Sequence, residues 1–282
     1  MKAKAYAKVN LFINVLDKRK DGYHELQMVN AKIDLYDDIS IEETDCQGMV
    51  MIRSNDMFLS NQNNVVFDVA KYMIKAHAPE KGVNITIEKN IPFGAGLAGN
   101  SADAACIIRL MDDLFDLHLS MQEMADIGLK FGADIPYCLY DGTAIVEGIG
   151  DKITPVEFPF EGQKLLLMHP KTYISTEKVF KKGDKSGFDN GDFDLIQKAI
   201  DTQNIEMFIS HMHNALQAIT IRENEKIAKA YAEIKEKVGT DGVVMTGSGS
   251  TFVKVFPKGN TTIEKNIDDF SDEIYVKAYN FL

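Results

Sequence analysis

Residues 92–105 read Pro-Phe-Gly-Ala-Gly-Leu-Ala-Gly-Asn-Ser-Ala-Asp-Ala-Ala, a run of small residues between two regular patterns. Before it, residues 83–89 alternate apolar and polar side chains as a strand does, and after it the apolar residues recur at helical spacing. Small residues let backbone N–H groups approach a ligand closely, and the start of a helix attracts anions. The stretch predicts a loop that cradles a phosphate, although a tight connection without a ligand has the same composition. It matches neither the P-loop nor the dinucleotide-binding glycine pattern.

The rest of the chain mixes strand and helix patterns. Residues 3–16 are typical of a strand, and the Asp-Gly pair at 21–22 predicts a hairpin turn after it. Further strands are predicted at 25–35, 39–53, 142–156 (a pair), 163–169, 243–245 and 252–256, and helices at 65–76, from Ser120 to about 130, and in three patterns up to about 238. These patterns predict a two-lobed α+β chain that divides near 155–165.

Composition excludes several classes of protein. The 31 basic and 42 acidic residues give a net charge of −11, which excludes a general nucleic-acid binder. No apolar stretch approaches the roughly 18 residues that a membrane span needs, and the N-terminus does not resemble a signal peptide. The three cysteines lie far apart without a C-x-x-C motif, which argues against disulfides and a cysteine zinc site and favours the cytoplasm.

Three segments together resemble the GHMP kinases, the superfamily of galactokinase, homoserine kinase, mevalonate kinase and phosphomevalonate kinase. Residues 92–105 are similar to its ATP-phosphate loop, residues 5–16 to its first motif and residues 245–252 to its third. The resemblance implies the two-lobed α+β GHMP kinase fold with an active site in the cleft between the lobes. It implies an N-terminal lobe like domain 2 of ribosomal protein S5, residues 1–158, and a ferredoxin-like C-terminal lobe, residues 159–282.

Additional segments are similar to one branch of this superfamily. They are Lys8-Val-Asn-Leu, Asp21-Gly-Tyr-His-Glu-Leu and Gly132-Ala-Asp-Ile-Pro. Members of that branch use ATP to phosphorylate the 2-hydroxyl of 4-(cytidine 5′-diphospho)-2-C-methyl-D-erythritol in the non-mevalonate route to isoprenoid precursors. The resemblance implies ATP and Mg²⁺ as cofactors and a monomer or weak homodimer without nucleic-acid or membrane partners. Two alternatives stay open: a homoserine, mevalonate or phosphomevalonate type of kinase, and a nucleotide- or cytidine-binding homologue with weakened turnover.

Two charged residues are candidates for catalysis. Asp134 lies between Gly132 and Pro136 after a predicted helix, where its carboxylate can face a cleft, whereas Lys8 by itself is compatible with a solvent-facing position on a strand. The resemblance identifies both as the catalytic pair. It implies that Asp134 accepts the proton of the attacking hydroxyl, while the Lys8 ammonium holds that carboxylate ionised and offsets charge on the phosphoryl group.

Four residues are candidates for substrate binding. By themselves, Tyr23 and His24 form an exposed hairpin tip. The resemblance implies that Tyr23 stacks on the cytosine base, that His24 hydrogen-bonds it, and that Tyr173 stacks on its other face. It also implies that Asn10 hydrogen-bonds the substrate near the reacting hydroxyl.

The resemblance assigns ATP binding to the loop and to two residues that align with the adenine pocket. These residues are Pro92, Phe93, Gly94, Ala95, Gly96, Leu97, Ala98, Gly99, Asn100, Ser101, Ala102, Lys89 and Asn64. The Ser101 hydroxyl is expected to cap the following helix or to meet a phosphate or its Mg²⁺. The loop departs from the superfamily pattern at position 100, where Asn replaces Gly. If that position needs a positive φ, Asn is the least costly replacement.

Overall fold

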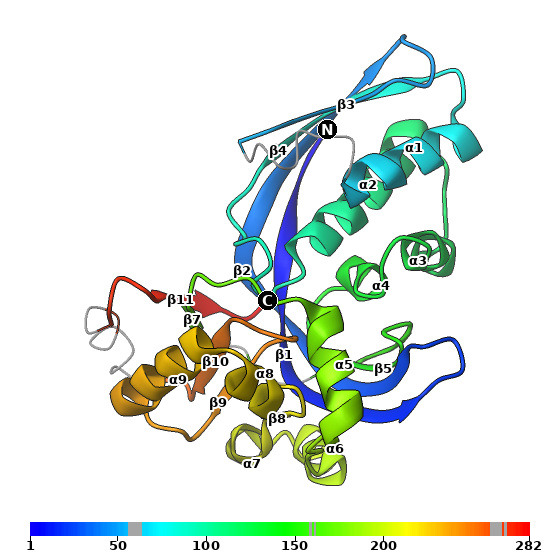
Figure 1. Cartoon of the computed structure of the whole chain (residues 1–282). Coiled ribbons are helices and arrows are strands. Elements are labelled where there is room, and N and C mark those ends of the chain that lie inside the picture. Colours follow the sequence, from blue (N-terminus) through cyan, green and yellow to red (C-terminus); the bar gives the residue numbers. More distant parts are fainter. Residues whose placement is uncertain (56–63, 158–159, 161, 260–266, 268–269) are drawn as a thin grey trace. The chain divides into compact units, whose positions relative to one another are not determined.

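The computed structural model describes residues 1–55, 64–157, 160, 162–259, 267 and 270–282, which form two compact units (Figure 1). Unit 1 consists of Met1–Lys8, Leu35–Pro92 and Ala98–Asp141, and unit 2 of Val9–Asp34, Phe93–Leu97 and Gly142–Leu282. This division differs from the sequence-based one because the two long strands at the N-terminus pass from one unit into the other. The predicted boundary at 158/159 lies outside the described residues and stays a prediction.

Strands of unit 1 follow the alternating patterns of the sequence. They are the first part of β1 (Lys2–Lys18), the second part of β2 (His24–Thr44), β3 (Val50–Ser54) and β4 (Gly82–Glu88), in the order β3-β4-β2-β1. Strand β4 pairs antiparallel with β2 and parallel with β3, and its apolar residues point into the core. The prediction of two separate strands at 25–35 and 39–53 is wrong, because β2 continues without a break through residues 36–38. Asp37 is tolerated there, since its buried carboxylate accepts the N–H groups of Asn90 and Ile91.

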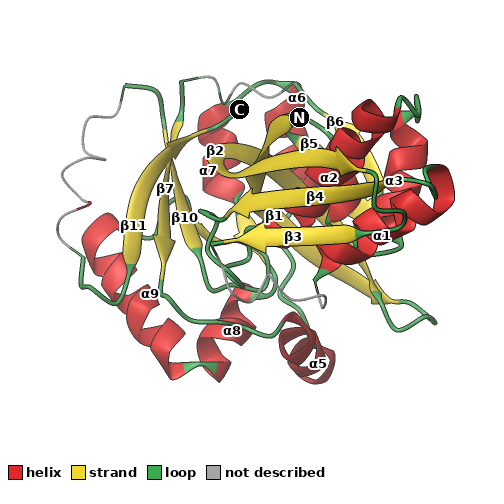
Figure 2. Ribbon diagram, turned by 90° about the horizontal axis from the view of Figure 1, so that it is seen from above, coloured by secondary structure: helices red, strands yellow, loops and turns green. Residues whose placement is uncertain are grey.

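Helices of unit 1 lie on one face of these strands (Figures 1 and 2). They are α1 (Val65–His77), α2 (Gly99–Phe115), α3 (Met121–Leu129) and α4 (Ile135–Leu139). The predicted helix at 65–76 is confirmed, and so is the capping box in which Ser120 and Glu123 bond to each other's backbone. Helix α2 is buried along most of its length in a core that it shares with α1, α3, α4 and β4. This packing fixes the position of α2 within unit 1; in the chain, the start of α2 directly follows the glycine-rich loop.

Unit 2 contains the remaining strands. The start of β2 pairs with β5 (Ala144–Gly148), which pairs with β6 (Lys152–Pro155), and β1 pairs with β8 (His213–Asn214). A separate antiparallel sheet has the order β11-β7-β10-β9 and consists of β7 (Lys164–His169), β9 (Val243–Met245), β10 (Phe252–Phe256) and β11 (Tyr275–Asn280). These strands confirm the patterns read at 142–156, 163–169, 243–245 and 252–256.

Helices of unit 2 are α5 (Thr176–Ser186), α6 (Phe193–Asp201), α7 (Ile205–His211), α8 (Gln217–Glu223) and α9 (Glu225–Val238). Helices α8 and α9 lie on one face of the four-stranded sheet (Figure 2), where the Tyr231 ring stacks on Phe252 of β10. The mixed architecture confirms the α+β fold class. No described helix is long and apolar enough to cross a bilayer. All three cysteines are described, and none of them forms a disulfide.

Candidate active site

Lys8 and Asp134 meet in unit 1. The Lys8 Nζ atom lies 3.3 Å from Asp134 Oδ1, with 4% of the Lys8 side chain and 43% of the Asp134 side chain exposed. Lys8 points inward from β1, whereas Asp134 precedes α4, which packs against α2 in the core. Asp134 occupies the N-cap position but makes no side-chain capping bond. The structure thus joins two residues that are far apart in the sequence and leaves the carboxylate open to solvent on one side.

The glycine-rich loop has the backbone of an anion cradle. Gly94, Gly96 and Ala98 have positive φ values of 63°, 77° and 55°, alternating with residues of negative φ. Such alternation turns successive N–H groups toward one point. A Cβ on Gly96 would lie 2.4 Å from the Thr246 carbonyl oxygen, so only glycine fits at this position. The loop passes directly into α2 at Gly99.

The start of α2 bears on Ser101 and Asn100. Its N-cap is Ala98, and no described side chain caps it, so Ser101 does not have the predicted capping role. Asn100 lies inside the first turn and is not among the residues of positive φ, so it causes no backbone strain; Ala98 adopts the left-handed conformation instead. Because the first N–H groups of a helix have no intrahelical acceptor, the uncapped start of α2 can bind an anion.

Asn10 contacts residues 245–252, the third glycine-rich segment, which is similar to the third motif of the superfamily. It is 1% exposed, and its Oδ1 atom accepts hydrogen bonds from the Gly247 N–H at 2.9 Å and the Thr246 hydroxyl at 3.3 Å. Its Nδ2 atom donates to Asn30 Oδ1 at 2.6 Å. The same Thr246 hydroxyl lies 3.1 Å from the carbonyl oxygen of Gly96 and shares its one hydrogen between this oxygen and Asn10 Oδ1. Asn10 therefore helps to hold the glycine-rich loop against the third glycine-rich segment, and its direct contact with substrate stays a prediction.

The two residues aligned with the adenine pocket have structural partners. Lys89 forms ion pairs with Asp37 and, at 2.7 Å, with Asp103, and neither carboxylate is exposed. Burial raises the pKa of Asp103 to about 7, an effect that the Lys89 charge opposes and the Asp37 charge increases. Asn64 caps α1 by accepting the Phe67 N–H at 2.8 Å. Their adenine contacts stay predictions.

The predicted cytosine-binding pair divides into an exposed and a buried residue. Tyr23 is 58% exposed, whereas His24 is 9% exposed, so the interpretation of both as an exposed hairpin tip is wrong for His24. The His24 ring stacks on Phe180 at a centroid distance of 4.9 Å and bonds Asp184 through Nε2 at 2.7 Å. One pattern in the sequence could have indicated these partners. Phe180 and Asp184 are four residues apart and share a face of the amphipathic helix α5.

Tyr173 packs against the glycine-rich loop. Its ring lies parallel to that of Phe93, with an interplanar angle of 11° and a centroid distance of 6.1 Å, and both side chains are more than half exposed. A Cβ on Gly94 would lie 2.4 Å from the Tyr173 ring, which explains the glycine there. Stacking of Tyr173 on cytosine stays a prediction.

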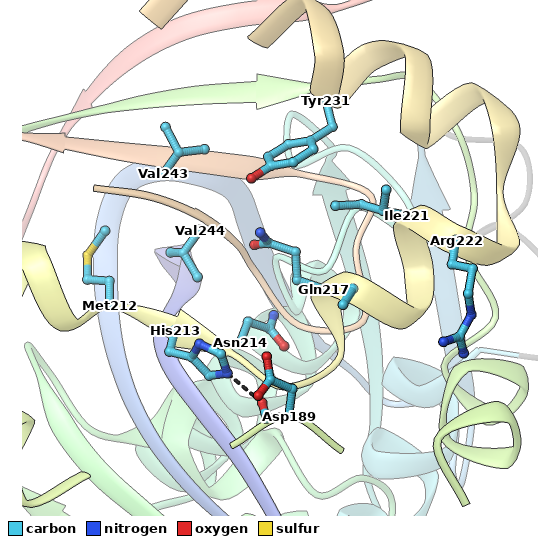
Figure 3. Close-up of a pocket in the computed structure, with 11 residues that line it drawn as sticks. Asp189, Met212, His213, Asn214, Gln217, Ile221, Arg222, Tyr231, Val243 and Val244 are labelled. Atoms are coloured by element: carbon cyan, nitrogen blue, oxygen red, sulfur yellow. Dashed lines mark hydrogen bonds between the residues drawn. The ribbon is translucent and has the colours of Figure 1, made fainter. Parts of the chain in front are cut away.

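A separate cavity of about 410 Å³ lies within unit 2 (Figure 3). None of the site residues predicted from the sequence lines it. Two of the residues that line it also bind the third glycine-rich segment. Asn214 Nδ2 donates to the carbonyls of Met245 and Gly247, and Gln217 Oε1 accepts the Met245 N–H. Within the described ranges, no cluster of three His, Cys, Asp or Glu side chains is placed to hold a metal ion.

Comparisons with known proteins show the family of this chain. Residues 64–142 match the family described as GHMP kinases N terminal domain. The chain is 40% identical over 259 residues to the 4-diphosphocytidyl-2-C-methyl-D-erythritol kinase of Clostridium tetani, covering 91% of both chains. It is 35% identical to the protein of the same name from Caldicellulosiruptor bescii, covering 91% of this chain and 89% of that one.

Solved structures share the fold. A crystal structure of 4-(cytidine 5′-diphospho)-2C-methyl-D-erythritol kinase has a TM-score of 0.80 at 24% identity, covering 100% of this chain and 99% of that one. The mevalonate kinase of Methanococcus jannaschii has a TM-score of 0.71 at 17% identity, covering 100% and 98%. The shared fold, together with the identity to curated relatives along most of the sequence, shows that this chain belongs to the 4-diphosphocytidyl-2-C-methyl-D-erythritol kinase family of GHMP kinases.

Proposed function

We propose that this chain transfers the γ-phosphoryl group of ATP to the 2-hydroxyl of 4-(cytidine 5′-diphospho)-2-C-methyl-D-erythritol. The observation that carries the proposal is the 3.3 Å contact between Lys8 Nζ and the partly exposed carboxylate of Asp134. Asp134 accepts the proton of the hydroxyl as it attacks, which is the role of the acidic residue in phosphoryl transfer to an alcohol. The Lys8 ammonium orients that carboxylate and offsets charge that develops on the transferring group.

The nucleotide phosphates bind the backbone of residues 94–101 in this proposal. Support comes from the alternating positive φ values at Gly94, Gly96 and Ala98 and from the uncapped start of α2, which together offer N–H donors to a phosphate. Ser101, in the first turn, is the residue that we propose to hold Mg²⁺, which when bound supplies positive charge at the phosphates.

Replacing Gly96 tests the cradle. A Cβ in the Gly96→Ala variant meets the Thr246 carbonyl, and the positive φ is unfavourable for alanine. Strain of about 1–3 kcal/mol corresponds to roughly a 5- to 150-fold change in an equilibrium constant, so we expect the KM for ATP to rise within that range. Gly48→Ala is the matched control, because Gly48 also has a positive φ but no atom within 4 Å of the added Cβ. An unchanged KM for ATP in Gly96→Ala would contradict the cradle.

Replacing Tyr23 tests the cytosine contact. Stacking of a base on an aromatic ring contributes about 1–3 kcal/mol, so Tyr23→Ala should raise the KM for the cytidine substrate roughly 5- to 150-fold. The KM for ATP and the melting temperature should change little, because the side chain is largely exposed. Tyr275→Ala, on β11, serves as a control for removal of a partly exposed tyrosine. If the protein were a mevalonate or homoserine type of kinase, Tyr23→Ala would leave its activity toward its alcohol substrate unchanged.

A coupled assay of ADP release on the purified protein tests the whole proposal. Turnover is expected with the cytidine substrate and not with homoserine, mevalonate or phosphomevalonate offered in parallel. A rate with the cytidine substrate no higher than that of Asp134→Asn would contradict it. Asn100 was the sequence feature that favoured a homologue with weakened turnover, and its strain-free helical position removes that support.

Location and assembly complete the proposal. We propose that the protein acts in the cytoplasm as a monomer or weak homodimer, without nucleic acid or membrane as a partner. The support is the net charge of −11 and the absence of disulfides among the three described cysteines, which suits a reducing compartment.

A further inference from the structure

His24 lies in a compact cluster that sequence patterns did not reveal. Helix α5 presents Phe180 and Asp184 on one face, four residues apart, and Phe188 follows the end of the helix. The His24 ring stacks on Phe180, and its centroid lies 5.5 Å from that of Phe188 in an edge-on arrangement. Gly183 makes this possible, because a Cβ there would lie 2.0 Å from the Phe188 ring. With 8% of its side chain exposed, the His24 ring is held in one orientation.

The hydrogen bond to Asp184 fixes which ring nitrogen carries a proton. His24 Nε2 lies 2.7 Å from Asp184 Oδ1. The other carboxylate oxygen, Oδ2, accepts from Lys18 Nζ at 2.5 Å. The hydrogen bond from Lys18, and after it that from His24, lowers the pKa of Asp184, so this carboxyl group is ionised at neutral pH. An ionised carboxylate only accepts hydrogen bonds, so the proton of this bond belongs to Nε2.

A neutral imidazole with its proton on Nε2 has a lone pair on Nδ1 and accepts a hydrogen bond there. Among the described residues, no group is hydrogen-bonded to His24 Nδ1. The 4-amino group of cytosine is a donor, whereas the 4-oxo group of uracil is an acceptor, like that of thymine. An acceptor at Nδ1 therefore forms a hydrogen bond with cytosine. With uracil, the lone pairs of Nδ1 and of the 4-oxo group face each other and repel.

We propose that Asp184 is a positioning residue that sets the tautomer of His24 and thereby makes the site prefer a cytidine over a uridine diphosphate substrate. The inference rests on the proposed function, because it takes His24 as a contact of the base. Asp184 itself does not touch the substrate in this account. Its effect is selective, since it concerns the one hydrogen bond that differs between the two bases.

Kinetics with two substrates test the inference. The probes are the cytidine substrate and the corresponding uridine 5′-diphospho derivative, each assayed for ADP release with wild type and with Asp184→Ala. We expect kcat/KM for the cytidine substrate to fall about tenfold through KM, and that for the uridine derivative to change less than twofold. The tenfold ratio corresponds to about 1.4 kcal/mol, one hydrogen bond. Lys18→Met is the matched control, because it removes the other partner of Asp184 but keeps the carboxylate, and its substrate preference should match wild type.

A measurement on the unmodified protein guards against a folding defect in the variant. The ¹⁵N chemical shifts of the two ring nitrogens distinguish the two neutral tautomers, and the His24 signals are assigned by their loss in His24→Gln. We expect the Nε2–H tautomer. A proton on Nδ1, or an equal loss of activity toward both substrates in Asp184→Ala, would overturn the inference. A wild type inactive toward both substrates would instead refute the proposed function.

Discussion

The Asp134→Asn variant should lose about 10²–10⁴-fold in kcat, the range that a positioned general base contributes. The amide has the size of the carboxylate but does not take up the hydroxyl proton. The KM for both substrates should stay close to that of wild type, because the lost interaction belongs to the reacting step. The side chain is 43% exposed and makes no capping bond, so the folded state should persist. Single-turnover and steady-state assays of ADP release measure the effect.

Asp141→Asn provides the matched control for this result. Asp141 lies shortly after α4, its side chain is 81% exposed, and its carboxylate is 3.8 Å from Arg109. We expect its kcat to equal that of wild type, which would show that the loss in Asp134→Asn does not come from a change of net charge near α4. An Asp134→Asn enzyme that keeps more than about a tenth of the wild-type kcat would be incompatible with the role of a general base.

The Lys89→Met variant should have the largest effect on stability, a loss of about 3–5 kcal/mol in the free energy of unfolding. Lys89 is the shared cation of Asp37 and Asp103, and both carboxylates are completely buried. Removing the ammonium leaves the two buried carboxyl groups of unit 1 without their shared counterion. Urea denaturation followed by circular dichroism measures the loss. Lys81→Met is the control, because it breaks an exposed ion pair with Glu43 and should change the midpoint little.

The cluster of Lys89, Asp37 and Asp103 should also make the stability of the protein depend on pH. The folded-state pKa of Asp103 is raised to about 7 from its ordinary value of 3.8, so between roughly pH 4 and 7 the folded protein holds a proton that the unfolded chain releases. Stability due to this group therefore falls as the pH rises through that window. In Lys89→Met the pKa rises further, because the favourable charge is lost, and the fall extends above pH 7. The variant should thus differ more from wild type at pH 8 than at pH 5; an equal difference at both would contradict this account.

Local patterns in the sequence were sufficient for most elements and for part of the site. The capping box at Ser120, the helix that begins at Val65 and the alternation in β4 involve residues within four positions of each other, so neighbouring residues alone predict them. The glycine-rich loop could also be predicted from the sequence, because a run of small residues before an amphipathic helix is typical of a tight loop. The pattern of small residues did not show which of them would have a positive φ: the structure gives it to Ala98, and the condition considered for Asn100 does not apply.

Contacts between distant residues decided the rest. His24 is buried because α5, which follows it by some 150 residues, places an aromatic ring and a carboxylate against it. Asn10 bonds the Gly247 amide across a separation of 237 residues, a pairing that depends on the register of β1 and the position of the third glycine-rich segment. By itself the sequence determined the α+β class, the family and the presence of a glycine-rich loop between a strand and a helix, since these follow from short motifs and periodicity. Only the tertiary structure brought Lys8 to Asp134 and gave Lys89 its two carboxylates, because strand register and helix packing, which neighbouring residues do not encode, set the distances between such side chains.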